Sequence, residues 1–92
     1  MKIKVKTFAT FRSCIGQEFL VDIPEGTRVI GLLELLTDGK PDFYNMLFES
    51  SGVLKDYVNI LINGRNISFI EGLESGIREG DVVAMFPPVG GG

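Results

Sequence analysis

The sequence Pro-Pro-Val-Gly-Gly-Gly at residues 87–92 constrains the fold most, because it fixes where regular structure must stop. Proline lacks a backbone N–H and its ring fixes φ, so two prolines in a row cannot continue a β-sheet. Glycine has no Cβ, so the following residues can lie in a narrow channel close to another molecule. We predict a folded domain over residues 1–86 and an extended, flexible tail over residues 87–92. A frayed terminus is the simpler alternative for the glycines alone.

Composition limits the class of protein. The 92 residues are 45% hydrophobic and 23% charged, which predicts one soluble globular domain. No apolar stretch approaches the about 20 residues that span a membrane, and the first residues do not resemble a signal peptide. A single cysteine cannot form an internal disulfide, which favours a cytoplasmic location. The net charge of −3 argues against binding to nucleic acid.

The chain lacks the residues that most catalytic sites need. It has no histidine and one cysteine, so neither a Ser-His pair, a Cys-His pair nor a Cys/His metal cluster can form within it. It also lacks a glycine-rich phosphate loop with its lysine. An enzyme built on this chain would depend on carboxylates, Lys or Tyr. We therefore expect a carrier or a substrate, without a bound cofactor or metal.

Residues 1–8 alternate between lysines and apolar residues, a period of two that predicts a half-buried strand. Its core face holds Ile3 and Val5, and its water face holds the lysines together with Phe8, a candidate contact residue. Residues 9–16 are predicted to form a loop that contains Arg12 and Cys14, the latter as a small packing residue. Residues 18–23 are predicted to form the second strand, with alternate apolar residues on one face.

The main predicted helix covers residues 27–36. Thr27 stands where an N-cap is expected, and Asp38-Gly39 supplies a C-terminal stop. The core-facing stripe follows helical spacing and comprises Val29, Leu32, Leu33 and Leu36. A second, shorter helix over residues 42–49 is predicted to begin after Pro41.

The rest of the chain is predicted to be mainly β-structure. Strands are expected over residues 57–62 and 65–69, joined by an Asn63-Gly64 hairpin turn, and over residues 81–86 after a loop at 72–80. Asp81 is interpreted as a turn residue. The first and last strands should be parallel neighbours. The predicted fold class is α+β, a mixed sheet packed on one main helix.

Several stretches carry a family resemblance. They are residues 80–89 with the terminal glycines, Phe8-Ala9 followed by Arg12, the Asn63-Gly64-Arg65 turn, and Gly72-Leu73. Together they resemble the ubiquitin-like β-grasp sulfur carriers of molybdopterin and thiamine biosynthesis, most of all the small subunits of molybdopterin synthase. The chain departs from that pattern at Gly90, where a small residue other than glycine is usual. Its longer segment at residues 39–56 favours the molybdopterin branch.

The resemblance implies chemistry at the tail. A ubiquitin-activating-type enzyme, using ATP and Mg²⁺ of its own, would adenylate the Gly92 carboxylate, and a sulfur donor system would convert it to a thiocarboxylate. Gly91 and Gly92 would be steric requirements of the channel. The large subunit of molybdopterin synthase would receive the sulfur. The chain itself would be a carrier subunit that donates sulfur without side-chain catalysis.

The resemblance and strand parity together predict a partner-binding surface. Phe86 should share the polar face with Phe8, because the two strands are expected to be adjacent. The predicted partner-binding residues are Phe8, Arg12, Leu61, Phe86, Pro87, Pro88, Val89 and Gly90. Burial of both rings in the core is the alternative.

Other functions remain open at this point. The same adenylate captured by a lysine would make the chain a protein modifier, and the sulfur could serve thiamine synthesis or tRNA thiolation. An enzyme that uses its own carboxylates is disfavoured, because no acidic pair marks a pocket. Molybdenum and tungsten cofactors are not distinguished.

Overall fold

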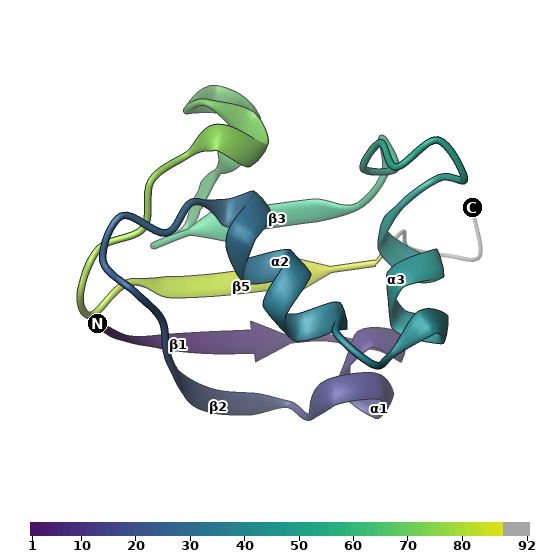
Figure 1. The fold of residues 1–92 in the computed structure, drawn as a ribbon, viewed down its shortest axis with the longest axis horizontal. Helices are drawn as coiled ribbons and strands as arrows, with labels where there is room; N and C mark the ends of the chain where they lie inside the picture. Colours follow the sequence, from purple (N-terminus) through teal and green to yellow (C-terminus); the bar gives the residue numbers. More distant parts are fainter. Residues whose placement is uncertain (88–92) are drawn as a thin grey trace.

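The computed structural model describes residues 1–87, so the predicted tail from Pro88 to Gly92 lies outside the described residues. The described part is a five-stranded mixed sheet in the order β2-β1-β5-β3-β4, with helices on one of its faces (Figure 1). This is the predicted α+β class.

The two ends of the described chain form the centre of the sheet. β1 (Lys2–Thr7) pairs in parallel with β5 (Val82–Phe86), as predicted. β2 (Glu18–Asp22) lies antiparallel to β1 at one edge. β3 (Asn59–Ile62) lies antiparallel to β5, and β4 (Arg65–Asn66) forms the other edge. The last strand is therefore held on both sides.

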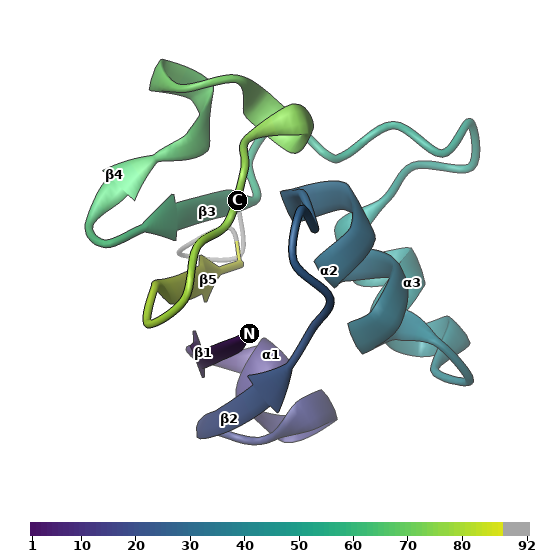
Figure 2. The ribbon, with the colours of Figure 1, turned by 60° about the vertical axis from the view of Figure 1, so that its left-hand side comes forward.

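Three helices connect the strands. α2 (Val29–Thr37) and α3 (Pro41–Leu47) cover one face of the sheet, and α1 (Thr10–Ile15) follows β1 directly (Figure 2). Two 3₁₀ turns, η1 (Ile67–Phe69) and η2 (Gly72–Glu74), lie between β4 and β5. Within residues 1–87 the opposite face of the sheet carries no helix (Figure 2).

The core lies between α2 and the sheet. Ile3 and Val5 are buried, whereas the lysines between them are not, as the alternation predicts. The predicted stripe on α2 is buried at every position: Val29, Leu32, Leu33 and Leu36. The expected stop at Asp38-Gly39 is confirmed, since Asp38 is the C-cap and Gly39 has a φ of 71°.

The prediction of a loop over residues 9–16 is wrong, because these residues contain α1. Phe11 has no exposed surface and packs edge to face on Phe43 of α3. Burial of this ring fixes one turn of helix that local propensity does not indicate. Cys14 is half-buried, as a packing residue should be, with Sγ 3.4 Å from Met46 Sδ.

The predicted N-cap at Thr27 is also wrong. α2 begins at Val29, with Arg28 at the cap position and no side-chain cap. The Thr27 hydroxyl instead donates to the carbonyl oxygen of Pro24 at 2.5 Å. The backbone N–H of Val29 donates to the carbonyl oxygen of Ser75 at 3.0 Å. A segment distant in the sequence thus accepts from a helix N–H that a capping side chain would otherwise bond.

The strand predicted over residues 65–69 ends after two residues. The Asn66 side-chain oxygen accepts from the backbone N–H of Ser68 at 2.9 Å, which caps η1 and turns the chain away from β3. The Asn63-Gly64 turn is as predicted, with φ of 50° and 85°. The preceding strand begins at Asn59 rather than at 57, and the second predicted helix ends at Leu47. The predicted loop at 72–80 contains the 3₁₀ turn η2.

Candidate functional site

Phe8 and Phe86 form a stacked pair at one end of the central strands. Their ring centroids are 4.2 Å apart and their planes differ by 6°. β1 and β5 are parallel with Thr7 opposite Met85, so the next residue of each strand projects to the same side. Both rings are half-buried. The predicted shared face is therefore correct, and the alternative of two core rings is not what the structure has.

Leu61 extends this surface across β3. It lies opposite Ala84, which shares a sheet face with Phe86 because alternate residues of β5 point the same way. Leu61 and Ala84 are half-buried. We call Phe8, Leu61, Ala84 and Phe86 the open-face patch. Its role in partner binding stays a prediction.

Charged residues border the open-face patch. Lys4 and Lys6 on β1 lie on the same face, and their ammonium groups are 3.5 and 3.9 Å from the carboxylate of Glu18 on β2. These side chains are roughly half exposed, so the pairs contribute little to stability. An apolar centre with a charged rim is the usual anatomy of a protein–protein interface.

Arg12 lies close to the patch in the chain. The backbone N–H groups of Phe11 and Arg12 donate to the carbonyls of Phe8 and Ala9, respectively. The first turn of α1 is therefore bonded directly to the backbone of Phe8. Arg12 is exposed on α1. That position is compatible with the predicted rim contact, and the contact itself remains a prediction.

Pro87 marks the exit of the tail and is half-buried. It borders a hollow of about 220 Å³ lined also by Thr10, Phe11, Met46, Lys55 and Tyr57. Sequence reasoning missed Lys55 and Tyr57 at this position. The sequence held a signal for Tyr57, an aromatic residue that alternation places on the opposite side of the predicted strand from Val58. In the structure Tyr57 is 52% exposed and Val58 is buried. The predicted site residues Pro88, Val89, Gly90, Gly91 and Gly92 lie outside the described residues.

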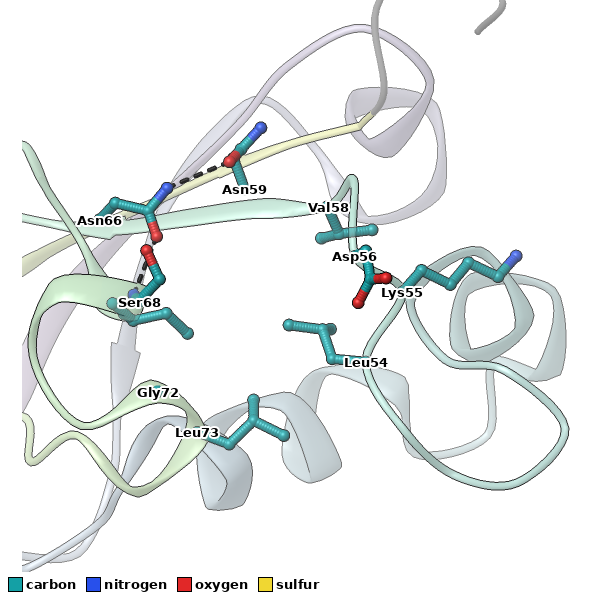
Figure 3. Close-up of a pocket in the computed structure, with 10 residues that line it drawn as sticks. Leu54, Lys55, Asp56, Val58, Asn59, Asn66, Ser68, Gly72 and Leu73 are labelled. Atoms are coloured by element: carbon teal, nitrogen blue, oxygen red, sulfur yellow. Dashed lines mark hydrogen bonds between the residues drawn. The ribbon is translucent and has the colours of Figure 1, made fainter.

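Another cavity, of about 270 Å³, lies between β3, the two 3₁₀ turns and the segment at residues 54–58 (Figure 3). Leu54 and Leu73 face each other across it, and its polar wall is an amide pair in which Asn66 Nδ2 donates to Asn59 Oδ1 at 3.0 Å. Lys55 points away from the cavity, and its ammonium donates to the carbonyl oxygen of Asn45 (Figure 3).

Among residues 1–87, no group of three or more His, Cys, Asp or Glu residues is placed to hold a metal ion. No helix in this described part is long and apolar enough to cross a bilayer. Asp81 is a turn residue, as predicted, because its carboxylate accepts from Arg78 N–H at 2.8 Å and from Asn63 Nδ2 at 2.9 Å.

Two known proteins and one solved structure are similar to this chain. Small archaeal modifier protein 3 of Haloferax volcanii is 30% identical over the full length of both chains. A protein of Archaeoglobus fulgidus, provisionally named a sulfur carrier protein, is 35% identical, also over the full length of both. A Pyrococcus furiosus structure, provisionally named molybdopterin converting factor subunit 1, is 34% identical with a TM-score of 0.76, covering 97% of this chain and 99% of that one.

These similarities extend from the first strand to the last glycines. Residues 5–92 match the ThiS family, a range that includes most of the sheet, the open-face patch and the predicted tail. Its fold is the ubiquitin-like β-grasp of the structures it resembles. The chain therefore belongs to the ThiS family of ubiquitin-like sulfur carriers and modifiers.

Proposed function

We propose that this chain is a sulfur carrier that presents Gly92 for adenylation and delivers sulfur to molybdopterin biosynthesis. One observation carries the proposal. The central strand β5 runs toward Pro87 at the end of the sheet where Phe8 and Phe86 stack. A partner that binds the open-face patch is thereby placed beside the start of the tail.

The proposed chemistry begins with a poor electrophile. A carboxylate oxygen of Gly92 attacks the α-phosphorus of ATP, which forms an acyl-adenylate and releases pyrophosphate. A persulfide of the donor system then attacks the acyl carbon, and AMP leaves. A thiol reduces the resulting acyl disulfide and releases the thiocarboxylate. ATP and Mg²⁺ belong to the activating enzyme in this scheme.

The contribution of this chain is position rather than catalysis. Gly91 and Gly92 have no Cβ, so a narrow channel can enclose their backbone and bring the carboxyl carbon to a fixed point. The binding energy from docking through the open-face patch would help to hold the tail in that geometry. The activating enzyme and the sulfur donor would supply the reacting groups.

The molybdopterin assignment rests on two supports. The ending Phe-Pro-Pro-Val-Gly-Gly-Gly resembles that of molybdopterin synthase small subunits. The similar Pyrococcus furiosus structure carries a molybdopterin converting factor name. In this scheme the tail enters the large subunit of the synthase, and the thiocarboxylate supplies the sulfur of the dithiolene.

A second candidate function is protein modification, favoured by the similarity to small archaeal modifier protein 3. The neutral ε-amine of a target lysine would then attack the acyl carbon of the same acyl-adenylate, AMP would leave, and an isopeptide bond would form with loss of the amine proton. Both functions use one tail and one activation step. They differ in the nucleophile that takes the acyl group.

Intact mass after co-expression with the cognate activating enzyme and sulfur donor tests the proposal. We expect a mass gain equal to the replacement of one oxygen by sulfur, absent from a variant that lacks Gly92. Adducts joined through Gly92 to lysines, without thiocarboxylate, would support the modifier function instead. An unchanged mass with an activating enzyme that is active on another carrier would contradict both.

The pathway requires a separate test. The thiocarboxylate form should co-purify with the large subunit of molybdopterin synthase and convert the sulfur-free precursor to the dithiolene. A thiocarboxylate form that binds the large subunit and yields no dithiolene would contradict the molybdopterin assignment and leave the carrier function standing.

A further inference from the structure

Among the residues that the structure describes, none pairs with the outer edge of β2. β2 is the first strand in the sheet order, and within residues 1–87 it pairs only with β1 (Figure 1). Ile23 N–H donates to the Met1 carbonyl and Thr7 N–H donates to the Gln17 carbonyl. Antiparallel pairing alternates, so the odd-numbered residues of β2 bond to β1. The backbone groups of Glu18, Leu20 and Asp22 therefore point away from the sheet.

This edge presents two different faces. On the open face of the sheet it carries Glu18, Leu20 and Asp22, all exposed, with Leu20 exposed to 61%. On the helix face it carries Phe19 and Val21, which pack against the core and are only half-buried. An added strand would thus meet an acidic face on one side and apolar side chains on the other.

The charges disfavour pairing with a second copy of β2. An antiparallel self-pair centred on Leu20 would place Glu18 opposite Asp22 of the other copy, twice. Like charges directly opposite each other on neighbouring strands are destabilising. Acidic residues at a sheet edge commonly prevent such self-association. The same residues favour a cationic strand.

We propose that the outer edge of β2 binds an extended segment of a partner protein in which lysine or arginine alternates with apolar residues. The cationic side chains would lie on the open face beside Glu18 and Asp22. The apolar side chains would lie on the helix face beside Phe19 and Val21. β1 shows that this pattern fits β2, because its lysines pair with Glu18 and its Ile3 and Val5 face the core. Addition of a strand to a free edge is a common mode of peptide recognition.

This surface is distinct from the open-face patch. β1 lies between β2 and β5, so a strand added at the edge is separated from Phe86 by two strands of the sheet. The edge could therefore be occupied while the tail is engaged. The proposal does not depend on whether the tail carries sulfur or joins lysines.

A synthetic peptide with the sequence of residues 1–7, Met-Lys-Ile-Lys-Val-Lys-Thr, is a suitable probe. Titrated into the full chain at low salt, it should protect the amides of Glu18, Leu20 and Asp22 from hydrogen exchange. The amides of Phe19 and Val21 should change little, because they already bond to β1. A peptide of the same composition with its three lysines consecutive should not give the alternating protection. Protection without alternation would overturn the proposal.

Two variants separate backbone pairing from charge. Leu20→Pro removes an outward N–H and no bond to β1, and proline is tolerated at such edge positions. It should weaken peptide binding by about tenfold. Asp22→Lys should weaken binding similarly, whereas Glu34→Lys, the same charge change on an exposed position of α2, should not. Equal binding by wild type and Asp22→Lys would overturn the proposal even if Leu20→Pro failed to fold.

The free protein provides a further check. Concentration-dependent protection of Glu18, Leu20 and Asp22 without peptide would mean that a second copy occupies the edge. That outcome would overturn the choice of a cationic partner.

Discussion

The ring of Phe11 meets the ring of Phe43 edge to face, with centroids 5.5 Å apart and planes at 82°. This contact joins α1 to α3, and both rings are fully buried. α1 is only six residues long, too short to be stable by itself. The position of α1 directly after Phe8 therefore depends on this aromatic pair.

Phe11→Ala should lower the free energy of unfolding by about 3–5 kcal/mol, since it removes a buried ring and leaves a cavity. Denaturant titration measures the change. Arg12→Ala is the matched control on the same helix, because Arg12 is exposed and its loss should cost no more than about 0.5 kcal/mol. Equal costs for the two variants would mean that Phe11 does not anchor α1.

Leu33→Ala should lower the free energy of unfolding by about 2–5 kcal/mol, because Leu33 is fully buried between α2 and the sheet. Leu35→Ala on the same helix removes a side chain that is 48% exposed and should cost much less. Thermal unfolding of the two variants gives the comparison. A larger loss of stability for Leu35→Ala than for Leu33→Ala would contradict the packing of the Leu33 face of α2 against the sheet.

Asn63→Ala tests the turn between β3 and β4. Asn63 has a φ of 50°, which asparagine tolerates better than alanine, and its side chain bonds to Asp81 and to the N–H of Val82. We expect a loss of about 1–3 kcal/mol, from about 0.5–1.5 kcal/mol for each hydrogen bond. Asp56→Ala, at another exposed polar position, is the control. A loss no larger than that control would show that the turn does not need this side chain.

Phe8→Ala and Phe86→Ala should each weaken binding to the activating enzyme by about 30-fold or more, the loss typical of a hot spot of ~2 kcal/mol. Isothermal titration with the enzyme measures the dissociation constant. Phe69→Ala removes a ring that is 74% exposed and lies outside the patch, so it should bind normally. If folded Phe8→Ala and Phe86→Ala proteins bound as the wild type does, the open-face patch would not be the docking surface.

Deletion of Gly92 should abolish adenylation and leave the free energy of unfolding unchanged, since glycine has no side chain to pack. The remaining carboxylate would fall short by about 3.3–3.6 Å, and a misplacement of about 1 Å can already cost about 10²-fold in rate. ATP–pyrophosphate exchange with the activating enzyme is the measurement. Gly90→Ala is the control and should be tolerated, because the family resemblance of the sequence implies a small side chain at this position. Full exchange by the deletion variant would exclude Gly92 as the reactive residue.

Local patterns predicted the framework of the fold. The alternation around Ile3 and Val5 and the leucine stripe of α2 set which side chains are buried, and burial depends mainly on those side chains themselves. The Asn63-Gly64 turn is equally local. The stacking of Phe8 on Phe86 followed from strand parity once the parallel pairing was assumed.

The missed features depend on partners far away in the sequence. α1 forms because Phe11 packs on Phe43. Thr27 is not a cap, because the carbonyl oxygen of Ser75 accepts from the Val29 N–H at the start of α2. The hollow at Pro87 arises where Lys55 and Tyr57 meet α1 and α3. No spacing within a single element contains that information.

The central position of β5 has a consequence for how the protein comes to be made. A ribosome makes β5 after the other four strands, yet within residues 1–87 it is β5 alone that joins β1 to β3 in the sheet. A nascent or truncated chain that lacks β5 leaves β1 without its parallel neighbour and cannot close the sheet, so folding must wait for synthesis of β5. An activating enzyme that contacts both the open-face patch and the tail would therefore select chains in which β5 has paired with β1 and β3.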